Sequence, residues 1–314
     1  MTRAIKSKAY EIGFQKIGIS PPDEPLLYNN YYDNWLTSGK HGTMKWLENH
    51  KQKRKNIFKY FPSVKSIISV AINYFTGTNE QIGFKENSVP NFSSYAWGKD
   101  YHIIVKQKLN DLLDHIKNEL NQNVKGIVCV DSSPVMEKQW AQRGGIGWQG
   151  KHTILINDDY GSWMFLGELL LDIPVEYDKP FQTDLCSTCT ACIDACPTNA
   201  LSEYQLDATK CISYLTIEYK GEFDTAKKSK LNDWIYGCDI CQQVCPWNKK
   251  KQKFTSEDSF NKIREIREYS LKDWQKMDDN SFNKIFLDSP IRRLKYDRFM
   301  RNVSAANQPS NSID

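Results

Sequence analysis

The pattern of apolar and polar positions predicts a mixture of helices and strands over the first 180 residues. Residues 63–74 are rich in β-branched side chains and follow a proline, which predicts a buried strand. In residues 100–121 the apolar positions recur at the spacing of a helix. Residues 1–60 look mostly helical, with breaks at a Ser-Pro-Pro sequence and at a glycine-containing loop. The other predicted elements are strands at 126–130, 152–156 and 163–171, a short helix at 135–143 and a loop at 76–94.

Helices and strands that alternate in this way indicate an α/β or α+β domain over residues 1–180. Residues 181–250 hold most of the cysteines and form a second part. Residues 251–314 form a third part, which is helical between 263 and 301 and ends in a polar tail. The core candidates of this helical part are Leu271, Trp274, Phe282, Ile285 and Phe286. We therefore expect an α+β fold in three parts, with boundaries near residues 180 and 250.

The composition is that of a globular chain with no membrane-spanning helix. The 314 residues are 40% hydrophobic and 25% charged, with a formal net charge of +4. No run of about 18 apolar residues is present, and the N-terminus reads as an amphipathic helix and not as a signal peptide. We therefore expect a cytoplasmic protein. Basic runs at 50–55, 249–253 and 292–301 are each typical of a solvated surface, but together they favour a polyanionic partner such as RNA.

Eight of the nine cysteines lie between residues 186 and 245. The first run has the spacing C-x2-C-x2-C-x3-C-P of bacterial ferredoxins and consists of Cys186, Cys189, Cys192 and Cys196. The second run repeats this spacing with one cysteine missing and consists of Cys238, Cys241 and Cys245. Cys211, between the runs, restores the count to eight. The spacing therefore predicts two 4Fe–4S clusters.

In ferredoxins the cysteine before proline in each run serves the other cluster, which divides the eight thiolates into two sets. The first set is Cys186, Cys189, Cys192 and Cys245. The second set is Cys238, Cys241, Cys196 and, by elimination, Cys211. Zinc is the alternative, because CxxC pairs also build tetrahedral zinc sites, although zinc ribbons rarely have this spacing. A disulfide framework is disfavoured in a chain of this length, and the ninth thiol, Cys129, is expected to be a small buried side chain.

Asp131 follows the predicted strand at 126–130, and two interpretations of it stay open. Carboxylates at strand ends bind ligands or take part in catalysis in open α/β sheets. Asp is also a favoured N-cap for a helix such as the one predicted next. Four glycines between Gly144 and Gly150 would let the backbone approach a flat ligand. Their spacing fits neither a dinucleotide-binding loop nor a P-loop.

Taken together, these segments resemble the epoxyqueuosine reductase family, the cobalamin-dependent iron–sulfur enzymes of queuosine tRNA modification. The blocks agree in order and spacing over roughly residues 1–250. The matching segments are 95–102, 130–134, 145–151, 161–168, 186–197, 206–216 and 236–248. The resemblance implies a fold like that of reductive dehalogenases: a cobalamin-binding α/β domain, a ferredoxin-like domain with two 4Fe–4S clusters, and here a C-terminal helical segment. It also implies the reduction of epoxyqueuosine to queuosine at the first anticodon position of tRNA.

The resemblance implies roles for individual residues. Asp131 matches the family's proton donor, a role that needs a protonated carboxyl, so we expect burial beside the corrin to raise the pKa of Asp131. The aligned cobalamin contacts are Arg54, Ser94, Asp131, Leu155, Leu166, Leu169, Asp239 and Ile240. The candidates to line a substrate pocket, with ordinary packing as the equal alternative, are Tyr95, Tyr101 and His102.

The sequence departs from the family in ways that bear on its partners. Many members continue into a C-terminal helical-repeat region, and this sequence reads as a short form without it. We therefore expect residues 249–253 and 292–301 to bind tRNA. An unidentified low-potential electron donor is implied, and a monomer is expected. The alternative functions are a related reductase that acts on a small molecule, as reductive dehalogenases do, and a two-cluster electron carrier, which would leave the first 180 residues without a purpose.

Overall fold

A four-stranded antiparallel sheet organises the first half of the chain. The computed structural model describes residues 1–23, 26–77, 90–120 and 122–306. The strands, in their order across the sheet, are β1 (Lys16–Ser20), β2 (Ser66–Asn73), β7 (Met164–Leu171) and β4 (Gly126–Cys129). Every neighbouring pair is antiparallel. β2 is buried along its whole length, which explains its continuous apolar sequence.

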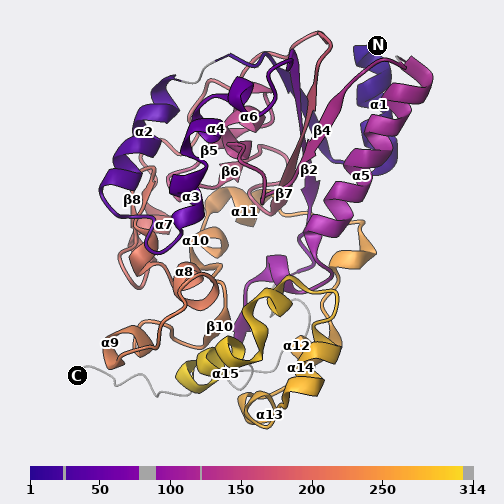
Figure 1. Cartoon of the computed structure of the whole chain (residues 1–314). Helices are drawn as coiled ribbons and strands as arrows, with labels where there is room; N and C mark the ends of the chain where they lie inside the picture. The colour runs from indigo at the N-terminus through magenta and orange to yellow at the C-terminus, as the bar shows by residue number, and fades with distance from the viewer. Residues whose placement is uncertain (24–25, 78–89, 121, 307–314) are drawn as a thin grey trace.

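Helices cover both faces of this sheet (Figure 1). The helices of this half of the chain are α1 (Thr2–Ile12), α2 (Leu26–Thr37), α3 (Lys45–Asn49), α4 (Lys51–Lys55), α5 (Tyr101–His115) and α6 (Glu137–Arg143). α1 and α5 lie side by side on one face, and α6 contacts β1, β2 and β7 on the other. The side chains of β7 alternate accordingly: Phe165 and Leu169 join the core beneath α1 and α5, whereas Leu166 and Leu170 lie on the α6 side.

Most predicted elements of this half are present. The strands predicted at 63–74, 126–130 and 163–171 are β2, β4 and β7, and the helices predicted at 100–121 and 135–143 are α5 and α6. β1 was not predicted, since five residues give too short a pattern to stand out between helices. The strand predicted at 152–156 is wrong in extent, because only β6 (Leu155–Ile156) is a strand, paired with β5 (Trp148–Gln149). Much of the loop predicted at 76–94 lies outside the described residues, but β3 (Asn91–Phe92) is a strand within it.

The glycine-rich segment makes close contacts within the chain. A Cβ atom at Gly147 would lie 2.0 Å from the carbonyl oxygen of Ile156, and one at Gly18 would lie 2.0 Å from that of Gly144. Gly145 has φ of 79°, which favours glycine. These glycines therefore let α6 and the β5–β6 hairpin pack tightly against their neighbours, which accounts for them without a flat ligand.

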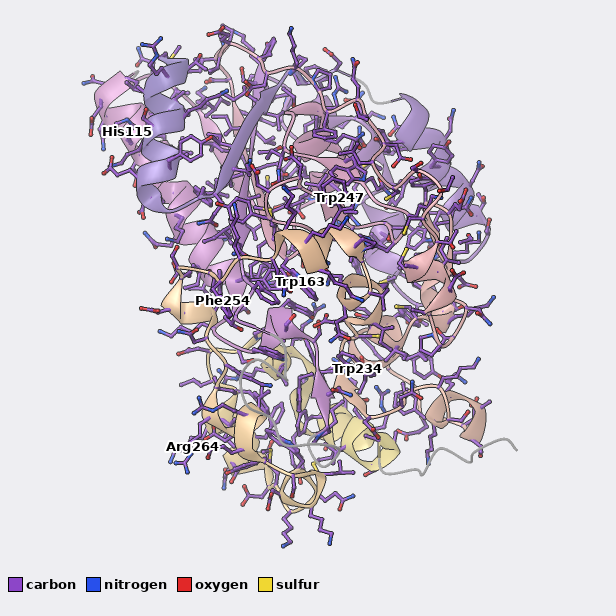
Figure 2. The ribbon with its side chains drawn as sticks, turned by 180° about the vertical axis from the view of Figure 1, so that it is seen from behind. His115, Trp163, Trp234, Trp247, Phe254 and Arg264 are labelled. Atoms are coloured by element: carbon purple, nitrogen blue, oxygen red, sulfur yellow. The ribbon has the colours of Figure 1, made fainter. Side chains whose placement is uncertain are left out.

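The cysteine-rich segment is a series of short elements that pack against the sheet half. They are α7 (Ala191–Asp194), β8 (Leu201–Ser202), β9 (Gln205–Leu206), η4 (Ala208–Lys210), α8 (Ile212–Ile217), α9 (Thr225–Lys228), β10 (Trp234–Tyr236), α10 (Ile240–Gln243) and α11 (Pro246–Lys251). Asn248 of α11 accepts a hydrogen bond from the Ser162 backbone N–H at 2.6 Å. Seen from behind, Trp163 and Trp247 lie near the centre of the molecule (Figure 2). β10 pairs in parallel with β3, so segments far apart in sequence interlock here.

The C-terminal helices enclose an aromatic core. The elements are η5 (Asp258–Phe260), α12 (Arg264–Glu268), α13 (Leu271–Gln275), α14 (Asp279–Ile285), η6 (Pro290–Leu294) and α15 (Lys295–Ala306). Trp274, Phe282 and Phe286 are almost fully buried, as predicted, and Leu271 and Ile285 pack at the edge of the same core. Residues of β3 and β10 join this core as well. In the parts of the chain that the structure describes, no helix is both long and apolar enough to span a membrane.

Candidate functional site

Four cysteines line one cavity of about 280 Å³. They are the members of the first predicted set, Cys186, Cys189, Cys192 and Cys245. Three come from the loop around the start of α7, and the fourth precedes α11, so the set crosses between the two runs. Cys189 is exposed, whereas Cys192 and Cys245 are buried. The sulfur atoms that line this cavity are therefore buried on one side of it, and the cavity opens to the surface at Cys189.

The other four cysteines lie close enough to affect one another's ionisation. Burial raises the pKa of the Cys238 thiol, and negative charge on Cys211 and Cys196 raises it further. Burial also raises the pKa of Cys241, with added effects from Cys238, Cys211 and Cys192. The interaction of Cys241 with Cys192 shows that the two groups of four adjoin.

Thiols this crowded fit a positively charged iron–sulfur cluster, since cationic iron relieves the repulsion between thiolates. Burial, then the neighbouring thiols, raises the pKa of Cys192 to about 11. Backbone amides already favour one thiolate, because the Ala200 N–H donates to Cys196 Sγ at 3.3 Å and the pKa of Cys196 is lowered. Among the described residues, no three His, Cys, Asp or Glu side chains are grouped tightly enough to hold a single metal ion.

Asp131 lies beyond the end of β4 and faces the start of α5. Its Oδ2 atom is 3.1 Å from Nε2 of His102, whose Nδ1 is 2.8 Å from Oδ1 of Asp100. Asp100 also caps α5 by accepting a hydrogen bond from the His102 backbone N–H. The Asp131 side chain is 51% exposed. The N-cap of α6 is Met136, so the capping interpretation of Asp131 is wrong.

Within the protein chain itself the pKa of Asp131 is not raised, and the expected effect of burial beside the corrin stays a prediction. Burial opposes ionisation of this carboxyl, but the hydrogen bond and the positive charge of His102 outweigh burial, so the pKa of Asp131 lies below its ordinary value. For His102, burial likewise opposes the charge, and Asp100 and Asp131 overcome it and raise the pKa of His102 to about 9. At neutral pH the pair therefore consists of an imidazolium and a carboxylate.

Glu137, the first residue of α6, contacts the backbone of Asp131. Its Oε1 atom accepts a hydrogen bond from the Asp131 backbone N–H. Burial, then the negative charge of Asp131, raises the pKa of Glu137 to about 8. Glu137 was not predicted as a site residue, and His102 was predicted only as a candidate to line a substrate pocket. The one available signal was that Glu137 begins the helix after the Asp131 loop.

Three predicted cobalamin contacts lie between the sheet half and the second cysteine group. The carboxylate of Asp239 accepts hydrogen bonds from Ser93 Oγ at 2.5 Å and from the backbone N and Oγ of Ser94 at 2.6 and 2.7 Å. Burial raises the pKa of Asp239. Ile240 follows and begins α10. This network fixes the Cys238–Cys241 loop to residues 93 and 94.

Arg54 and the three leucines occupy different places. Arg54 donates a hydrogen bond from Nη1 to the Val135 carbonyl oxygen at 3.1 Å, so it braces the loop that carries Asp131. Leu155 and Leu166 pack in one small cluster on the α6 side of the sheet. Leu169 is fully buried on the opposite face. The Leu169 side chain therefore does not share a surface with the other two leucines.

Some of the buried polar atoms without hydrogen-bond partners in the described structure lie on α6 or close to it. They are the side-chain amide atoms of Gln139, Trp140 Nε1, Arg54 Nε and His152 Nε2. Arg54 reaches the α6 region through its bond to Val135, and His152 precedes Thr153, whose carbonyl oxygen accepts from Lys138 of α6. His152 also lines the cavity of the first cysteine set. Buried polar groups normally have partners. These atoms therefore fit a large polar ligand, and the amide and phosphate groups of cobalamin offer the matching donors and acceptors.

The three basic runs differ in what their side chains do. In the first run, Lys51 and Lys55 both pair with Asp33. In the third, Arg301 donates to the carbonyl oxygens of Tyr219, Gly221 and Leu215, at 2.9, 2.6 and 3.3 Å. The second run ends α11 with three exposed lysines, Lys249, Lys250 and Lys251. The expectation that residue Arg301 is free to bind tRNA is therefore wrong, since this side chain holds the fold together.

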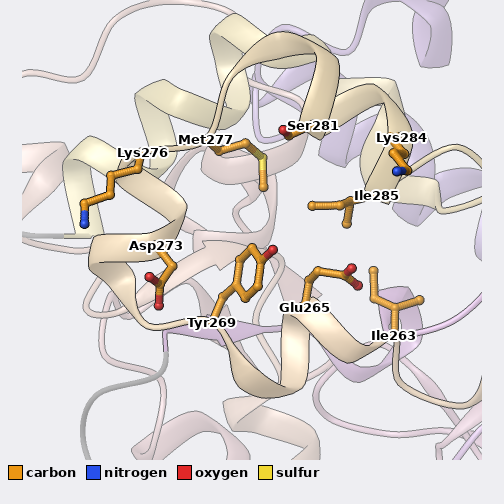
Figure 3. Close-up of a pocket in the computed structure, with 9 residues that line it drawn as sticks. All are labelled: Ile263, Glu265, Tyr269, Asp273, Lys276, Met277, Ser281, Lys284 and Ile285. Carbon is orange, nitrogen blue, oxygen red and sulfur yellow. The ribbon is translucent and has the colours of Figure 1, made fainter.

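A second cavity, of about 640 Å³, lies among the C-terminal helices (Figure 3). Its wall combines apolar side chains with charges of both signs, from Ile263, Glu265, Tyr269, Asp273, Lys276, Met277, Ser281, Lys284 and Ile285. It contains no cysteine and no residue predicted to bind cobalamin. The chemistry predicted from the sequence therefore gathers around the sheet and the cysteine groups.

Comparison with known proteins agrees with this arrangement. Residues 54–132 match the family model described as epoxyqueuosine reductase QueG, DUF1730, and residues 185–248 match a 4Fe–4S double cluster binding domain. The epoxyqueuosine reductase of Cyclobacterium marinum is 39% identical over 96% of this chain and 95% of its own length. That of Leadbetterella byssophila is 41% identical over 96% of this chain and 97% of its own length.

Solved structures share the whole fold. A structure of epoxyqueuosine reductase with an epoxyqueuosine-modified tRNA-Tyr stem loop has a TM-score of 0.87 at 29% identity, over 97% of this chain and 80% of that chain. A Bacillus subtilis epoxyqueuosine reductase, whose catalytic aspartate loop is swung out of the active site, has a TM-score of 0.86 at 28% identity, with the same shares of the two chains covered. With relatives this similar over nearly its full length, the chain is an oxidoreductase that belongs to the epoxyqueuosine reductase family.

Proposed function

We propose that the protein reduces epoxyqueuosine to queuosine in tRNA with cobalamin, two 4Fe–4S clusters and Asp131 as the proton donor. The reaction adds two electrons and two protons, turns the epoxide into an alkene and releases the oxygen as water. The observation that supports this most directly is the pairing of Asp131 with His102. This pair can hold a proton where an opening epoxide needs one.

The cysteines supply the cluster ligands in this proposal. One cluster would be held by Cys186, Cys189, Cys192 and Cys245, which line one cavity. The other would be held by Cys196, Cys211, Cys238 and Cys241. Cys189 is exposed and Cys241 is half-buried, so electrons from a low-potential donor would enter at the first cluster and leave from the second.

Cobalamin, when bound, would supply a strongly reducing cobalt centre. Arg54, the Ser94–Asp239 pair, Ile240 and the Leu155–Leu166 surface would hold it. The unpartnered atoms around α6 support this, since each could bind an amide or phosphate group of the ligand. The Leu169 side chain is left out of the proposed contacts because it lies on the other face of the sheet.

Asp131 would deliver the proton through its pairing with His102. The carboxylate is ionised in the resting pair, and the proton lies on the imidazolium. As negative charge develops on the epoxide oxygen, Asp131 would take the proton from the His102 imidazolium and pass it to that oxygen. Asp100 orients the imidazole by accepting from its other nitrogen.

The test is anaerobic turnover of epoxyqueuosine-containing tRNA with a reductant and cobalamin, followed by nucleoside mass spectrometry. Asp131→Asn should lose most of the turnover, while Asp158→Asn, at an exposed site in the turn after β6, should keep it. Corrin absorbance of each purified protein checks that cobalamin is retained. Full turnover by Asp131→Asn would overturn the donor role, and a purified parent without corrin bands would favour an electron carrier.

The cluster assignment has its own matched pair of variants. Cys211→Ser should reduce the iron and sulfide content by about one cluster per chain, because the second cluster loses a ligand. Cys129→Ala should leave the iron content unchanged, since Cys129 is fully buried beneath α6 and burial raises its pKa to about 12. Equal iron content in Cys211→Ser and the parent would contradict the assignment.

The remaining partners are proposed from the charge and exposure of surface residues. The tRNA backbone would meet Lys249, Lys250 and Lys251, which are exposed and together at the end of α11. The electron donor would approach Cys189. The cytoplasmic location and the monomeric state stay predictions.

A further inference from the structure

The backbone of Asp131 has a conformation that needs support from outside the residue. Its φ is 50°, in the left-handed region that non-glycine residues rarely adopt. Residues held in this region persist when their surroundings fix them, and such residues concentrate at functional sites. A contact from another residue must therefore hold Asp131 in this left-handed conformation.

Glu137 makes a contact that ties the two ends of the Asp131 loop together. The Asp131 backbone N–H donates to Glu137 Oε1, across six residues of sequence. Two backbone hydrogen bonds within the loop are local, from the Ser132 N–H to the Val130 oxygen and from the Val135 N–H to the Ser133 oxygen. Arg54 adds a bond to the Val135 oxygen at 3.1 Å. Arg54 braces the end of the loop near α6, and Glu137 fixes Asp131 near its beginning.

The backbone and side chain of Asp131 are fixed as a unit. With its N–H on Glu137, the residue directs its carboxylate to His102, at 3.1 Å from Nε2. A return of φ to negative values would turn the N–H away from Glu137 and the side chain away from His102. We propose that Glu137 is a positioning residue, which holds Asp131 in the conformation that pairs it with His102. This inference rests on the proposed function, because the position of Asp131 matters for turnover only if Asp131 carries the proton.

The charge state of Glu137 suits this role. Burial, then Asp131, raises the pKa of Glu137 to about 8, so the group is largely neutral at pH 7. A neutral carboxyl can accept the N–H bond without a second negative charge beside the Asp131 carboxylate. Arg54 and Lys138 face Glu137 and favour its ionisation, whereas the buried Glu168 carboxyl is a further acidic neighbour. A glutamine would offer the same acceptor atom at the same reach.

Two substitutions separate positioning from acid–base chemistry. Glu137→Gln keeps the acceptor and its reach but cannot donate a titratable proton. Glu137→Asp keeps a carboxyl but is one methylene too short to reach the Asp131 N–H. If Glu137 positions Asp131, Gln should keep kcat within about threefold of the parent, and Asp should lower kcat by about tenfold or more, with KM for tRNA little changed. If Glu137 were itself an acid–base group, the order would be reversed.

A second measurement does not depend on turnover. NMR titration of His102 in the full chain, assigned with a His102→Gln sample, should give a pKa near 9 in the parent and in Glu137→Gln. In Glu137→Asp the His102 pKa should fall by at least about one unit, because Asp131 no longer faces the imidazole. Melting temperatures check that both variants are folded. A parental His102 pKa in Glu137→Asp would overturn the proposal. Loss of turnover in Asp131→Asn tests the donor role separately, so the two ideas can fail independently.

Discussion

The carboxylate of Asp131 and the imidazole of His102 share one proton across 3.1 Å, and that proton lies on the imidazole at neutral pH. A lone aspartate would need a raised pKa to carry a proton to the substrate. The pair removes this need, because His102 keeps a proton up to about pH 9 and stands next to the group that would transfer it. The proton supply is thus set by two residues that are 29 positions apart in the sequence.

We expect His102→Gln to move the alkaline limit of activity to lower pH. In the parent, turnover should fall as pH rises through about 9, where His102 loses its proton. Without His102 the only proton of the pair is that of Asp131, whose ordinary pKa is about 4. In His102→Gln, the decline of kcat/KM that the parent shows near pH 9 should therefore occur at a pH lower by roughly two units or more.

Two further histidine and aspartate variants sharpen this test. His115→Gln, which removes a histidine paired with Glu119 at the far end of α5, should leave the profile in place. Asp100→Asn removes one of the two carboxylates that raise the His102 pKa. The pH at which its kcat/KM declines should therefore lie between the values for the parent and for His102→Gln. An alkaline limb that stays near pH 9 in His102→Gln would rule out His102 as the proton source.

Stability should depend on pH through Glu137. Its pKa is about 8 in the folded protein against an ordinary 4.5, so between these values the folded chain holds a proton that the unfolded chain has lost. The free energy of unfolding must then fall as pH rises through this window. In Glu137→Gln the side chain at this position does not titrate. The melting temperature of this variant relative to that of the parent should therefore rise by roughly 3 °C or more from pH 6 to pH 8.

His102 acts in the same direction in both proteins and therefore cancels in this comparison. Its folded pKa of about 9 lies above the ordinary 6.5, so its stabilisation is complete below pH 6.5 and is lost as pH rises to 9. The measurement is differential scanning calorimetry of both proteins from pH 5 to 9. A constant difference in melting temperature across that range would mean that Glu137 is ionised in the folded state.

Arg301→Met should destabilise the fold and not merely weaken tRNA binding. Arg301 donates to three carbonyl oxygens around α8, and its guanidinium lies 4.0 Å from the Phe223 ring centroid. Loss of these charged donors leaves carbonyl groups unpaired, at a cost of about 2–4 kcal/mol in the free energy of unfolding. Arg292→Met is the matched control, because the exposed Arg292 side chain donates one hydrogen bond in the described structure, to the Leu287 carbonyl oxygen, and its loss should change stability by about 0.5 kcal/mol or less. Equal urea midpoints for the two variants would contradict this role.

Much of the fold and of the metal chemistry could be predicted from local patterns. The β-branched run of β2 and the helical spacing of α5 are strong signals within single elements. The two cysteine sets could be divided because ferredoxin spacing carries the rule that each Cys-Pro serves the other cluster. The cavity lined by Cys186, Cys189, Cys192 and Cys245 unites members of both runs as that rule requires.

The proton site could not be predicted because it depends on contacts between distant segments. The pKa of Asp131 was expected to rise with burial, and the structure shows that His102, from another element, reverses the shift. Glu137 gave no signal, since a Glu at the start of a helix is common and its contact with Asp131 exists only when the loop folds. The roles of Arg54 and Arg301 were likewise hidden, because charge runs look alike whether they are solvated or bound to carbonyl groups.

Neutralising the end of α11 should weaken tRNA binding in a way that depends on salt. Lys249, Lys250 and Lys251 are exposed and adjacent at the end of α11. Each phosphate contact to single-stranded RNA contributes about 0.7 to the slope of log Kd against log salt concentration. Lys249→Gln, Lys250→Gln and Lys251→Gln combined should therefore reduce this slope by about 1–2 in fluorescence anisotropy titrations with an anticodon stem loop.

The control for this triple variant removes the same charge elsewhere. Lys272, Lys276 and Lys284 are exposed on the C-terminal helices, and two of them line the larger cavity. Their combined change to Gln lowers the net charge equally, so any effect of overall charge on the RNA appears in both variants. A specific contact at α11 predicts a flatter slope only in the first variant. Parental slopes in both would exclude α11 as a tRNA surface, and equal flattening in both would mean that the RNA senses only the net charge of the protein.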